Sequence, residues 1–292
     1  MSNLNVRSQT LADARGLGSI NTLLGRSLGR LSSGNRLAGL VTDPSAVGAV
    51  GRLDAQQKRA QAASVNVQNA ASFVQSSVGL MASVGNLLSR MSELSQYATD
   101  GMKNAGDIAL YQDEFEKLQD QLRQTIGGTI AEIGGLTDVN NPMGTFNDVP
   151  LFGANPTGTS IASSSKAGDT INIPETNFRD GAMLELFRQD AAGNYVLTVT
   201  DPTSIAKVTA AISDLSDERS VLAGVGSRLE FAFNTLTVEK QNISAAVSRI
   251  QDVDVATEST RLSKLNILYE SGTAMLSQAN QAPRAVLKLL EA

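Results

Sequence analysis

The stretch ISDLSDERSVLAGVGSRLEFAFNTLTVEKQNISAAVSRI, residues 212–250, decides the fold. Leucine or isoleucine returns every seven residues, at Leu215, Leu222, Leu229, Leu236, Ile243 and Ile250. A heptad repeat sustained this long is typical of the apolar seam of a coiled coil. The alternative is a core helix of an ordinary bundle. The expected length favours the coiled coil, because a helix of about 45 residues would be about 65 Å long, more than most globular cores.

Helix signals continue on either side of this stretch. Asp201 and Pro202 precede it, a good N-cap followed by proline at the first helical position. Asp43 and Pro44 repeat the device and predict a long helix to about residue 99. A further helix is predicted over about 107–133, where apolar residues again recur at coiled-coil-like spacing.

Both ends of the chain carry an apolar helical stripe. Near the N-terminus it consists of Leu17, Ile20, Leu24, Leu28 and Leu31; after about residue 252 it includes Leu265, Leu268, Met275, Leu276, Val286 and Leu290. We expect the two ends to pair, which covers only part of the stripes. Contacts with identical neighbours would cover the rest, and head-to-tail contacts that do not close give a helical filament.

The middle of the chain, residues 134–200, changes character. Gly, Pro, Asn and Thr become frequent, and helical periodicity disappears. Short strands are predicted at 169–175, 182–190 and 194–200, with AAGN (191–194) as a hairpin turn and 156–165 as an exposed loop. The predicted fold is therefore mainly α: a long antiparallel coiled-coil or helical-bundle rod with a small β-rich subdomain of hairpins in the middle of the chain.

Composition excludes most chemistry. The chain has neither cysteine nor histidine, which removes disulfides, thiol catalysis, imidazole-based triads and most transition-metal sites. The acidic groups Asp113, Glu114 and Glu116, and Asp214, Asp217 and Glu218, lie on charged helix faces and are interpreted as solvated. We therefore expect no enzyme activity, no catalytic residue, no metal and no cofactor.

Charge and hydropathy restrict the partners and the location. The formal net charge of −5 argues against a nucleic-acid partner. No apolar run approaches about 20 residues, so membrane insertion is not expected. The first residues lack the apolar core of a cleavable secretory signal, which taken alone predicts a cytosolic protein.

Three segments resemble the signature segments of bacterial flagellin: RLSSGNRL (30–37), SRIQDVDVATE (248–258) and GTAMLSQANQAP (272–283). The resemblance covers about 1–135 and 202–292, in the family's order and separation. FNDVPLF (146–152) is also similar to a family segment, with Asp148 where glycine is usual.

This resemblance implies a structural subunit that polymerises into the flagellar filament for swimming motility. Residues 1–42 and 253–292 would form the inner terminal coiled-coil domain. Residues 43–252 would form a rod-like helical domain that includes the β-rich part, and the outer variable domains would be absent. Export through the flagellar type III apparatus, unfolded and uncleaved, would make the protein extracellular. The implied partners are the chain itself, an export chaperone, the type III export gate, and the junction and cap proteins.

The resemblance extends to a helix motif recognised by the flagellin-sensing Toll-like receptor. LSRMSELSQY (88–97) retains Leu88, Arg90, Glu93 and Leu94, and GSRLE (226–230) retains Arg228. Because Ser89, Ser92 and Tyr97 depart from that motif, weakened receptor recognition is expected. Alternatively these residues serve the seam and contacts between protofilaments.

Other classes of protein fit less well. A hook–filament junction protein shares the terminal architecture but diverges from GTAMLSQANQ. An enzyme carried on a flagellin scaffold would need catalytic residues in 134–200, and the absence of histidine removes the metallopeptidase version. A membrane-active translocator would need a longer apolar segment.

Overall fold

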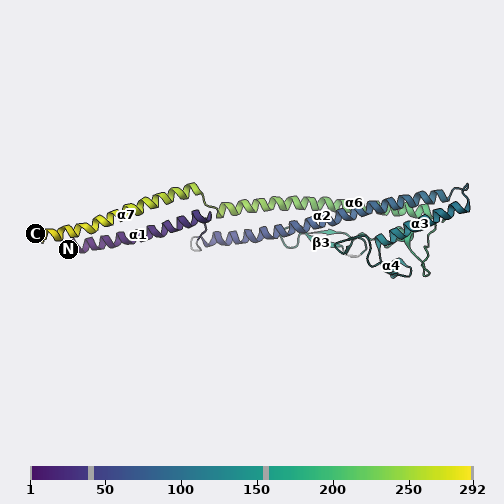
Figure 1. Cartoon of the computed structure of the whole chain (residues 1–292), viewed down its shortest axis with the longest axis horizontal. Helices are drawn as coiled ribbons and strands as arrows, with labels where there is room; N and C mark the ends of the chain where they lie inside the picture. Colours follow the sequence, from purple (N-terminus) through teal and green to yellow (C-terminus); the bar gives the residue numbers. More distant parts are fainter. Residues whose placement is uncertain (1, 39–42, 154–157, 291–292) are drawn as a thin grey trace. The chain divides into compact units, whose positions relative to one another are not determined.

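The computed structural model describes residues 2–38, 43–153 and 158–290, except for the side chains of 2–10, 280 and 282–290. The helices are α1 (Ser2–Ser33), α2 (Pro44–Ala98), α3 (Ala105–Ile126), α4 (Ile130–Ile133), α5 (Gly181–Phe187), α6 (Ser204–Gln251) and α7 (Val255–Leu290) (Figure 1). Strands β1 (Thr145–Phe146) and β2 (Val149–Pro150) pair antiparallel, as do β3 (Thr159–Ala162) and β4 (Thr170–Ile173). The predicted fold class, mainly helical with long antiparallel helices and small hairpins in mid-chain, is confirmed.

The chain forms two compact units. The terminal unit combines Met1–Lys58 with Lys240–Ala292, and the middle unit is Arg59–Glu239. Both boundaries fall inside long helices, α2 and α6, rather than at the helix breaks near residues 43 and 252.

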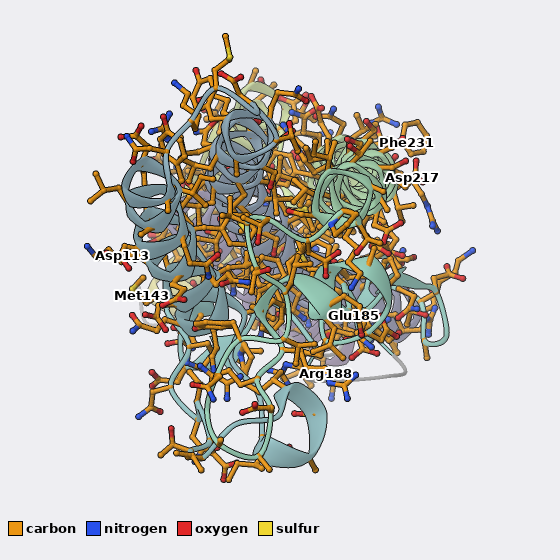
Figure 2. All side chains as sticks on the ribbon, turned by 90° about the vertical axis from the view of Figure 1, so that its right-hand side faces the viewer. Asp113, Met143, Glu185, Arg188, Asp217 and Phe231 are labelled. Atoms are coloured by element: carbon orange, nitrogen blue, oxygen red, sulfur yellow. The ribbon has the colours of Figure 1, made fainter. Side chains whose placement is uncertain are left out.

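In the middle unit, α2 and α6 run antiparallel (Figure 1). Ser95 and Ser204 share a hydrogen bond of 2.6 Å between their Oγ atoms, and a Cβ on Gly85 would meet Leu215 at 3.4 Å. One residue number falls as the other rises, which defines an antiparallel register. Figure 2 shows Asp217 and Phe231 on the outer side of α6, opposite its packed face.

One hydrophobic core fills the middle unit. The core cluster contains the seam-spaced leucines of α6 and the buried face of α2, together with aromatic and aliphatic side chains from α3, α5 and the hairpin region. The rings of Phe152 and Phe178 lie 5.1 Å apart, and Phe73 meets Phe146 edge-on at 5.9 Å. Buried Gln119 donates from Nε2 to the carbonyls of Leu186 (2.6 Å) and Leu197 (3.0 Å), which joins α3 to the segments around α5.

The predicted strand at 169–175 is confirmed as β4, but two other strand predictions are wrong. Residues 182–190 largely form helix α5, and 194–200 contributes only an isolated bridge, Gln189 to Tyr195. The turn between them is present, with Gly193 at φ +85° and its N–H donating to the carbonyl of Asp190 at 3.1 Å. Helix α5 has only seven residues, too few for a helical period to stand out in the sequence.

Two further differences concern element boundaries. The helix predicted to run to residue 133 ends at Ile126, because Gly127 adopts φ +68° and Gly128 φ +142°, conformations that break a helix and favour glycine. The loop predicted at 156–165 contains strand β3, while its first two residues lie outside the described part of the chain.

The β1–β2 hairpin explains the unusual residue in FNDVPLF. Asn147 and Asp148 form its turn at φ +51° and +61°. Two consecutive left-handed residues suit a two-residue hairpin turn, where Asn and Gly are preferred. Asp148 therefore occupies a backbone position that glycine would adopt with less strain.

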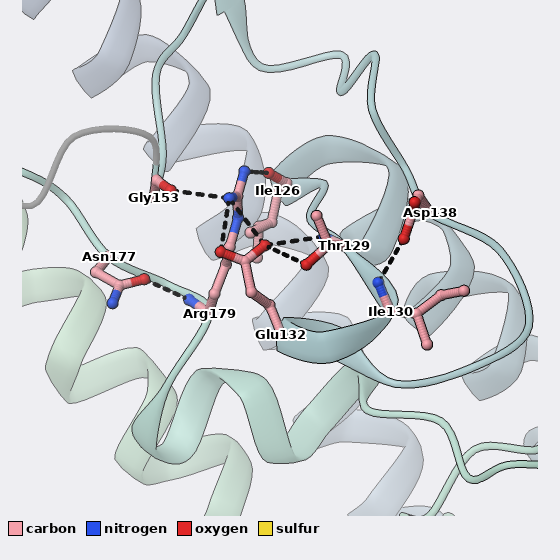
Figure 3. A network of polar contacts seen from close by, with 8 residues as sticks. All are labelled: Ile126, Thr129, Ile130, Glu132, Asp138, Gly153, Asn177 and Arg179. Atoms are coloured by element: carbon pink, nitrogen blue, oxygen red, sulfur yellow. Dashed lines mark hydrogen bonds and ion pairs between the residues drawn. The ribbon is translucent and has the colours of Figure 1, made fainter.

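A network around Arg179 fixes the loops beside these hairpins (Figure 3). Its guanidinium donates to the carbonyls of Gly153 (2.8 Å) and Ile126 (3.4 Å) and forms an ion pair with Glu132 at 3.3 Å. Hydrogen bonds from Thr129, with the Arg179 charge, hold the pKa of Glu132 below its usual value. One arginine thus joins the end of α3, helix α4 and the segment after β2.

An aspartate lies at or shortly before the first residue of three long helices, α2, α6 and α7. Asp43 accepts the Ala46 N–H at 3.0 Å and begins α2, as predicted. Asp201 accepts the Thr203 N–H at 2.7 Å, but α6 begins only at Ser204, so Pro202 lies in the turn before the helix. Asp254 accepts the N–H groups of Ala256 (3.0 Å) and Thr257 (3.2 Å) and caps α7.

Candidate functional site

The two ends of the chain form one helix pair, α1 with α7, inside the terminal unit. The helices lie side by side and antiparallel (Figure 1). Leu17 contacts the region of Gly272, and Ser27 contacts Glu258. Residues separated by more than 230 positions in the sequence are therefore neighbours, as the apolar stripes at both ends predicted.

A buried polar cluster lies at one end of this pair, where α1 approaches its C-terminal end and α7 begins. Ser27 Oγ donates to Glu258 Oε1 at 2.5 Å, and Arg30 Nη1 lies 3.9 Å from Glu258 Oε2. The Glu258 side chain is only 9% exposed. A buried charge must be paired, and removing its partner is far costlier than replacing the whole cluster by apolar groups. The cluster therefore resists any slip of α1 along α7.

Glycine allows the two helices to approach closely about halfway along the pair. A Cβ on Gly272 would lie 2.8 Å from Leu17 Cδ2, too close for an unshifted contact. Gly272 opens the GTAM segment, so the glycine in that motif has a direct packing reason.

Directly beyond the Glu258 cluster, where α1 ends, two of the motif segments bind each other through their backbones. The Arg36 N–H donates to the carbonyl of Gln251 at 2.6 Å, and the Val253 N–H donates to that of Gly34 at 3.0 Å. The Arg36 guanidinium also donates to the Ile250 carbonyl, at 2.8 Å from Nη2. RLSSGNRL and SRIQDVDVATE thus form one joint where α1 and α6 end and α7 begins.

The predicted terminal interface residues occupy three kinds of position. Leu265 is buried, and half-buried positions are held by Leu17, Ile20, Leu24, Leu31 and Leu276. Leu28, Leu268 and Met275 face solvent, Met275 with 74% of its surface exposed. Val286 and Leu290 belong to α7, but their side chains lie outside the described residues.

The residues predicted for the coiled-coil seam lie on one face of α6. Leu215, Leu222, Leu229, Leu236 and Ile243 are buried, and Ile250 is half-buried. The first four belong to the core of the middle unit.

The residues of the receptor-like motif are divided between core and surface. Leu88 and Leu94 are fully buried. Arg90 is on the surface and forms two ion pairs. Its Nη1 lies 2.9 Å from Glu93 Oε2, and its Nε lies 2.7 Å from Glu114 Oε1. The carboxylates of Glu114 and Glu93 raise the pKa of Arg90. Arg228 is exposed on α6. Of the five retained residues, only the three charged ones therefore offer side chains at the surface, where Ser89 and Tyr97, which depart from the motif, are also exposed.

The sequence did not assign roles to Ser27, Glu258, Gly272 or Arg36. The last three were present in the motif segments, so their signal was the motif itself. Periodicity could not identify them, because their roles depend on the register between two helices at opposite ends of the chain.

The candidate carboxylates do not assemble a chemical site. Glu114 pairs with Arg90, and Glu116 accepts a hydrogen bond from Gln112 at 2.8 Å. Within residues 2–38, 43–153 and 158–290, no acidic cluster is arranged to hold a metal ion. None of the described helices combines the length and the apolar character needed to cross a bilayer.

Comparison with known proteins shows which family the two helical ends of the chain resemble. Residues 4–130 match the bacterial flagellin N-terminal helical region, and residues 205–290 match the bacterial flagellin C-terminal helical region. The chain is 30% identical to the flagellin of Bacillus subtilis, over 94% of this chain and 95% of that protein. The chain belongs to the flagellin family.

Other relatives agree over nearly the whole length. The flagellar filament 33 kDa core protein of Treponema phagedenis is 29% identical over 98% of this chain and 99% of that protein. The flagellin of Listeria monocytogenes is 30% identical over 89% and 90%, respectively. This flagellin is therefore a structural, non-enzymatic subunit that polymerises in the extracellular bacterial flagellar filament, the organelle of motility.

Proposed function

We propose that this flagellin assembles through the outward faces of α1 and α7, which become buried against neighbouring copies of the same chain. In this proposal residues 1–42 and 253–292 form the inner coiled-coil domain of the filament. Residues 43–252 form the surrounding rod-like domain, and outer variable domains are absent.

The observation that carries this proposal is how little the terminal helix pair buries. Among the described side chains of α1 and α7, Leu265 is the only large apolar one that is buried. Leu11, Leu28, Ile267, Leu268 and Met275 are exposed. Fully burying one such side chain is worth about 1.5–3 kcal/mol, so covering this surface with neighbours would stabilise assembly strongly.

The same shortage of buried surface supports export in an unfolded form. Two helices with so small a core are marginally stable by themselves, and their ordering energy can come from burial against neighbours. We infer that the ends order on assembly, after passage through the type III export gate. An export chaperone would hold the apolar C-terminal segment first, and junction and cap proteins would contact the filament at its ends.

Among the retained motif residues, recognition by the flagellin-sensing Toll-like receptor would involve the charged Arg90, Glu93 and Arg228, with Ser89 and Tyr97 exposed beside them. Leu88 and Leu94 are covered by the core in the folded chain. We expect weakened activity in a receptor reporter assay, and full potency at ordinary flagellin doses would contradict this expectation.

Seeded polymerisation tests the assembly proposal. Met275→Glu places a charge on an exposed apolar position of α7, so the isolated chain should keep its fold while elongation is lost. Ser277→Glu is the matched control, because it adds the same charge to the same helix about 200° around its axis. Filament length by negative-stain electron microscopy and helicity by circular dichroism are measured together.

The outcomes separate the candidate roles. Filaments from the wild type and Ser277→Glu, with none from Met275→Glu or from a chain lacking residues 272–292, support assembly through this face. Normal filaments from Met275→Glu would contradict the proposed interface. A wild-type chain that stays monomeric on seeds would favour a junction-protein role.

A further inference from the structure

Charge is divided unequally between the two units. The terminal unit has thirteen basic and eight acidic residues, a formal charge of +5. The middle unit has eleven basic and twenty-one acidic residues, a formal charge of −10. The modest net charge of −5 therefore conceals two strongly charged parts of opposite sign.

The exposed cations of the terminal helix pair form no ion pair within the described residues. Arg15 and Arg26 are exposed on α1, and Arg261 and Lys264 are exposed on α7. In the described part of this pair, the one ion pair is Arg30 with Glu258, which is buried between the helices. The exposed cations are therefore available to an outside partner.

The middle unit shows the reverse situation. Its cations Arg90, Arg179, Arg188 and Lys207 are engaged in ion pairs with glutamates, and Arg123 donates to three backbone carbonyls. The six other cations of the unit stand against seventeen acidic residues that form none of these ion pairs. Asp113 and Asp217 project outward from α3 and α6, on different sides of the unit (Figure 2).

Like charges on α6 already oppose one another. Burial raises the pKa of Glu218, and the neighbouring charges of Asp214, Asp217 and Asp180 raise it further. A cationic surface brought close to this face would relieve that repulsion.

We propose that the basic surface of α1 and α7 in one copy docks against the acidic α6 face of the middle unit in a second copy, the face that carries Asp214, Asp217 and Glu218, and that this attraction accelerates filament elongation. The inference rests on the proposed assembly function and extends it. The second copy is the occupant that the charges favour, because every subunit supplies both surfaces. Complementary patches act mainly by steering the encounter and fixing orientation.

Two neutralised variants test the proposal in the full-length chain. The terminal-neutral variant carries Arg15→Gln, Arg26→Gln, Arg261→Gln and Lys264→Gln, which lowers the terminal unit from +5 to +1. The middle-neutral variant carries Asp214→Asn, Asp217→Asn and Glu218→Gln, which changes the middle unit from −10 to −7. Elongation from wild-type seeds is followed by light scattering and electron microscopy.

The middle-neutral variant distinguishes complementarity from simple repulsion between negatively charged chains. Complementarity predicts that both variants elongate about tenfold more slowly at low salt, the lower end of electrostatic steering effects. Simple repulsion predicts that the middle-neutral variant, being nearly neutral overall, elongates faster than the wild type. Faster elongation of that variant would therefore overturn the proposal.

A control variant removes positive charge from the acidic unit. Lys117→Gln, Lys166→Gln and Arg219→Gln make the middle unit more negative. Under the proposal this variant elongates at least as fast as the wild type, whereas net repulsion would slow it.

Salt provides a second measurement on the wild type. Sodium chloride raised from about 0.05 M to 0.5 M screens exposed charges, so elongation should slow and the difference between variants should shrink. Elongation that is unaffected or accelerated by salt overturns the charge proposal and leaves assembly itself intact. Absence of wild-type filaments would overturn the assembly proposal as well. Altered helicity of the dilute monomer with unchanged elongation would indicate contact within one chain, which also contradicts the proposal.

Discussion

The middle unit and the terminal helix pair differ in how much apolar surface they bury. The middle unit has a continuous core, whose fully buried members run from Ala60 to Leu236. The terminal pair, among its described side chains, has one large buried apolar residue, Leu265, and a buried polar cluster around Glu258. A helix pair specified by a polar contact and a glycine fixes its register without gaining much stability, so it depends on neighbours.

Aromatic residues follow the same division. All eight phenylalanines of the chain lie in the middle unit, and Phe115, Phe152, Phe178 and Phe187 are among its largest fully buried side chains. Aromatic side chains bury the most area per residue. The low aromatic content of the whole chain therefore reflects a terminal unit built almost without them.

The largest expected effect comes from breaking the core of the middle unit. Leu229→Asp puts a charge at a fully buried position of α6, and we expect a loss of more than about 4 kcal/mol in the free energy of unfolding. Urea unfolding followed by circular dichroism measures it. Val238→Asp, at an exposed position of the same helix, is the control and should cost less than about 1 kcal/mol. Normal motility of the Leu229→Asp strain would contradict the seam prediction.

A smaller loss is expected when the polar support of the middle unit is removed. Arg179→Ala leaves the carbonyls of Gly153 and Ile126 without their donor, and we expect a cost of about 2–3 kcal/mol. Arg188→Ala removes an ion pair whose arginine is more than half exposed, and its cost should stay within about 0.5 kcal/mol. Equal midpoints in urea for the two variants would show that the Arg179 network does not stabilise this unit.

Sequence reasoning succeeded where a long period carried the information. The heptad of α6 and the stripes of α1 and α7 could be read because each repeats over many turns. The start of α2 could be read because Asp43 followed by proline is a local helix-start signal. The segment 182–190 was not, because α5 is short and its helical state is decided by packing against α3. The contact of Ser27 with Glu258 depends on the register of two distant helices, which no local pattern encodes.

A third test compares two glycines in the terminal pair. Gly25→Ala meets nothing within 4 Å and should stabilise α1 by about 0.5–1 kcal/mol, the usual gain over glycine in a helix. Gly272→Ala should instead cost about 1–2 kcal/mol, because its Cβ would lie 2.8 Å from Leu17 Cδ2. Helicity and seeded elongation should fall for Gly272→Ala alone, while the unfolding of the middle unit is unchanged.

The double variant Gly272→Ala with Leu17→Ala checks the cause. Removing the clashing side chain should recover part of the lost helicity, a non-additive result expected only for residues in contact. If the two losses simply add, close approach of the helices is not the reason for the glycine.

The smallest expected effect concerns acid, and it should appear first in α7. Hydrogen bonds from the Thr257 hydroxyl and from the N–H groups of Thr257 and Ala256 hold the pKa of Asp254 below its usual value. Because the folded pKa is lower than the unfolded one, the cap stabilises α7 above the ordinary aspartate pKa. That contribution is lost as the pH falls through the folded value.

Asp254→Asn separates this cap from general acid unfolding. Asparagine still accepts the N–H bonds but does not titrate, so helicity that the wild type loses as the pH falls below the ordinary aspartate pKa should be retained in the variant. The expected difference is smaller than that of Gly272→Ala, because the carboxylate is fully exposed and solvent screens it. Identical acid profiles for the two chains would place the acid sensitivity elsewhere. If helicity is lost in α7 while the middle unit stays folded, the terminal helix pair, which lacks a continuous core, unfolds first at low pH.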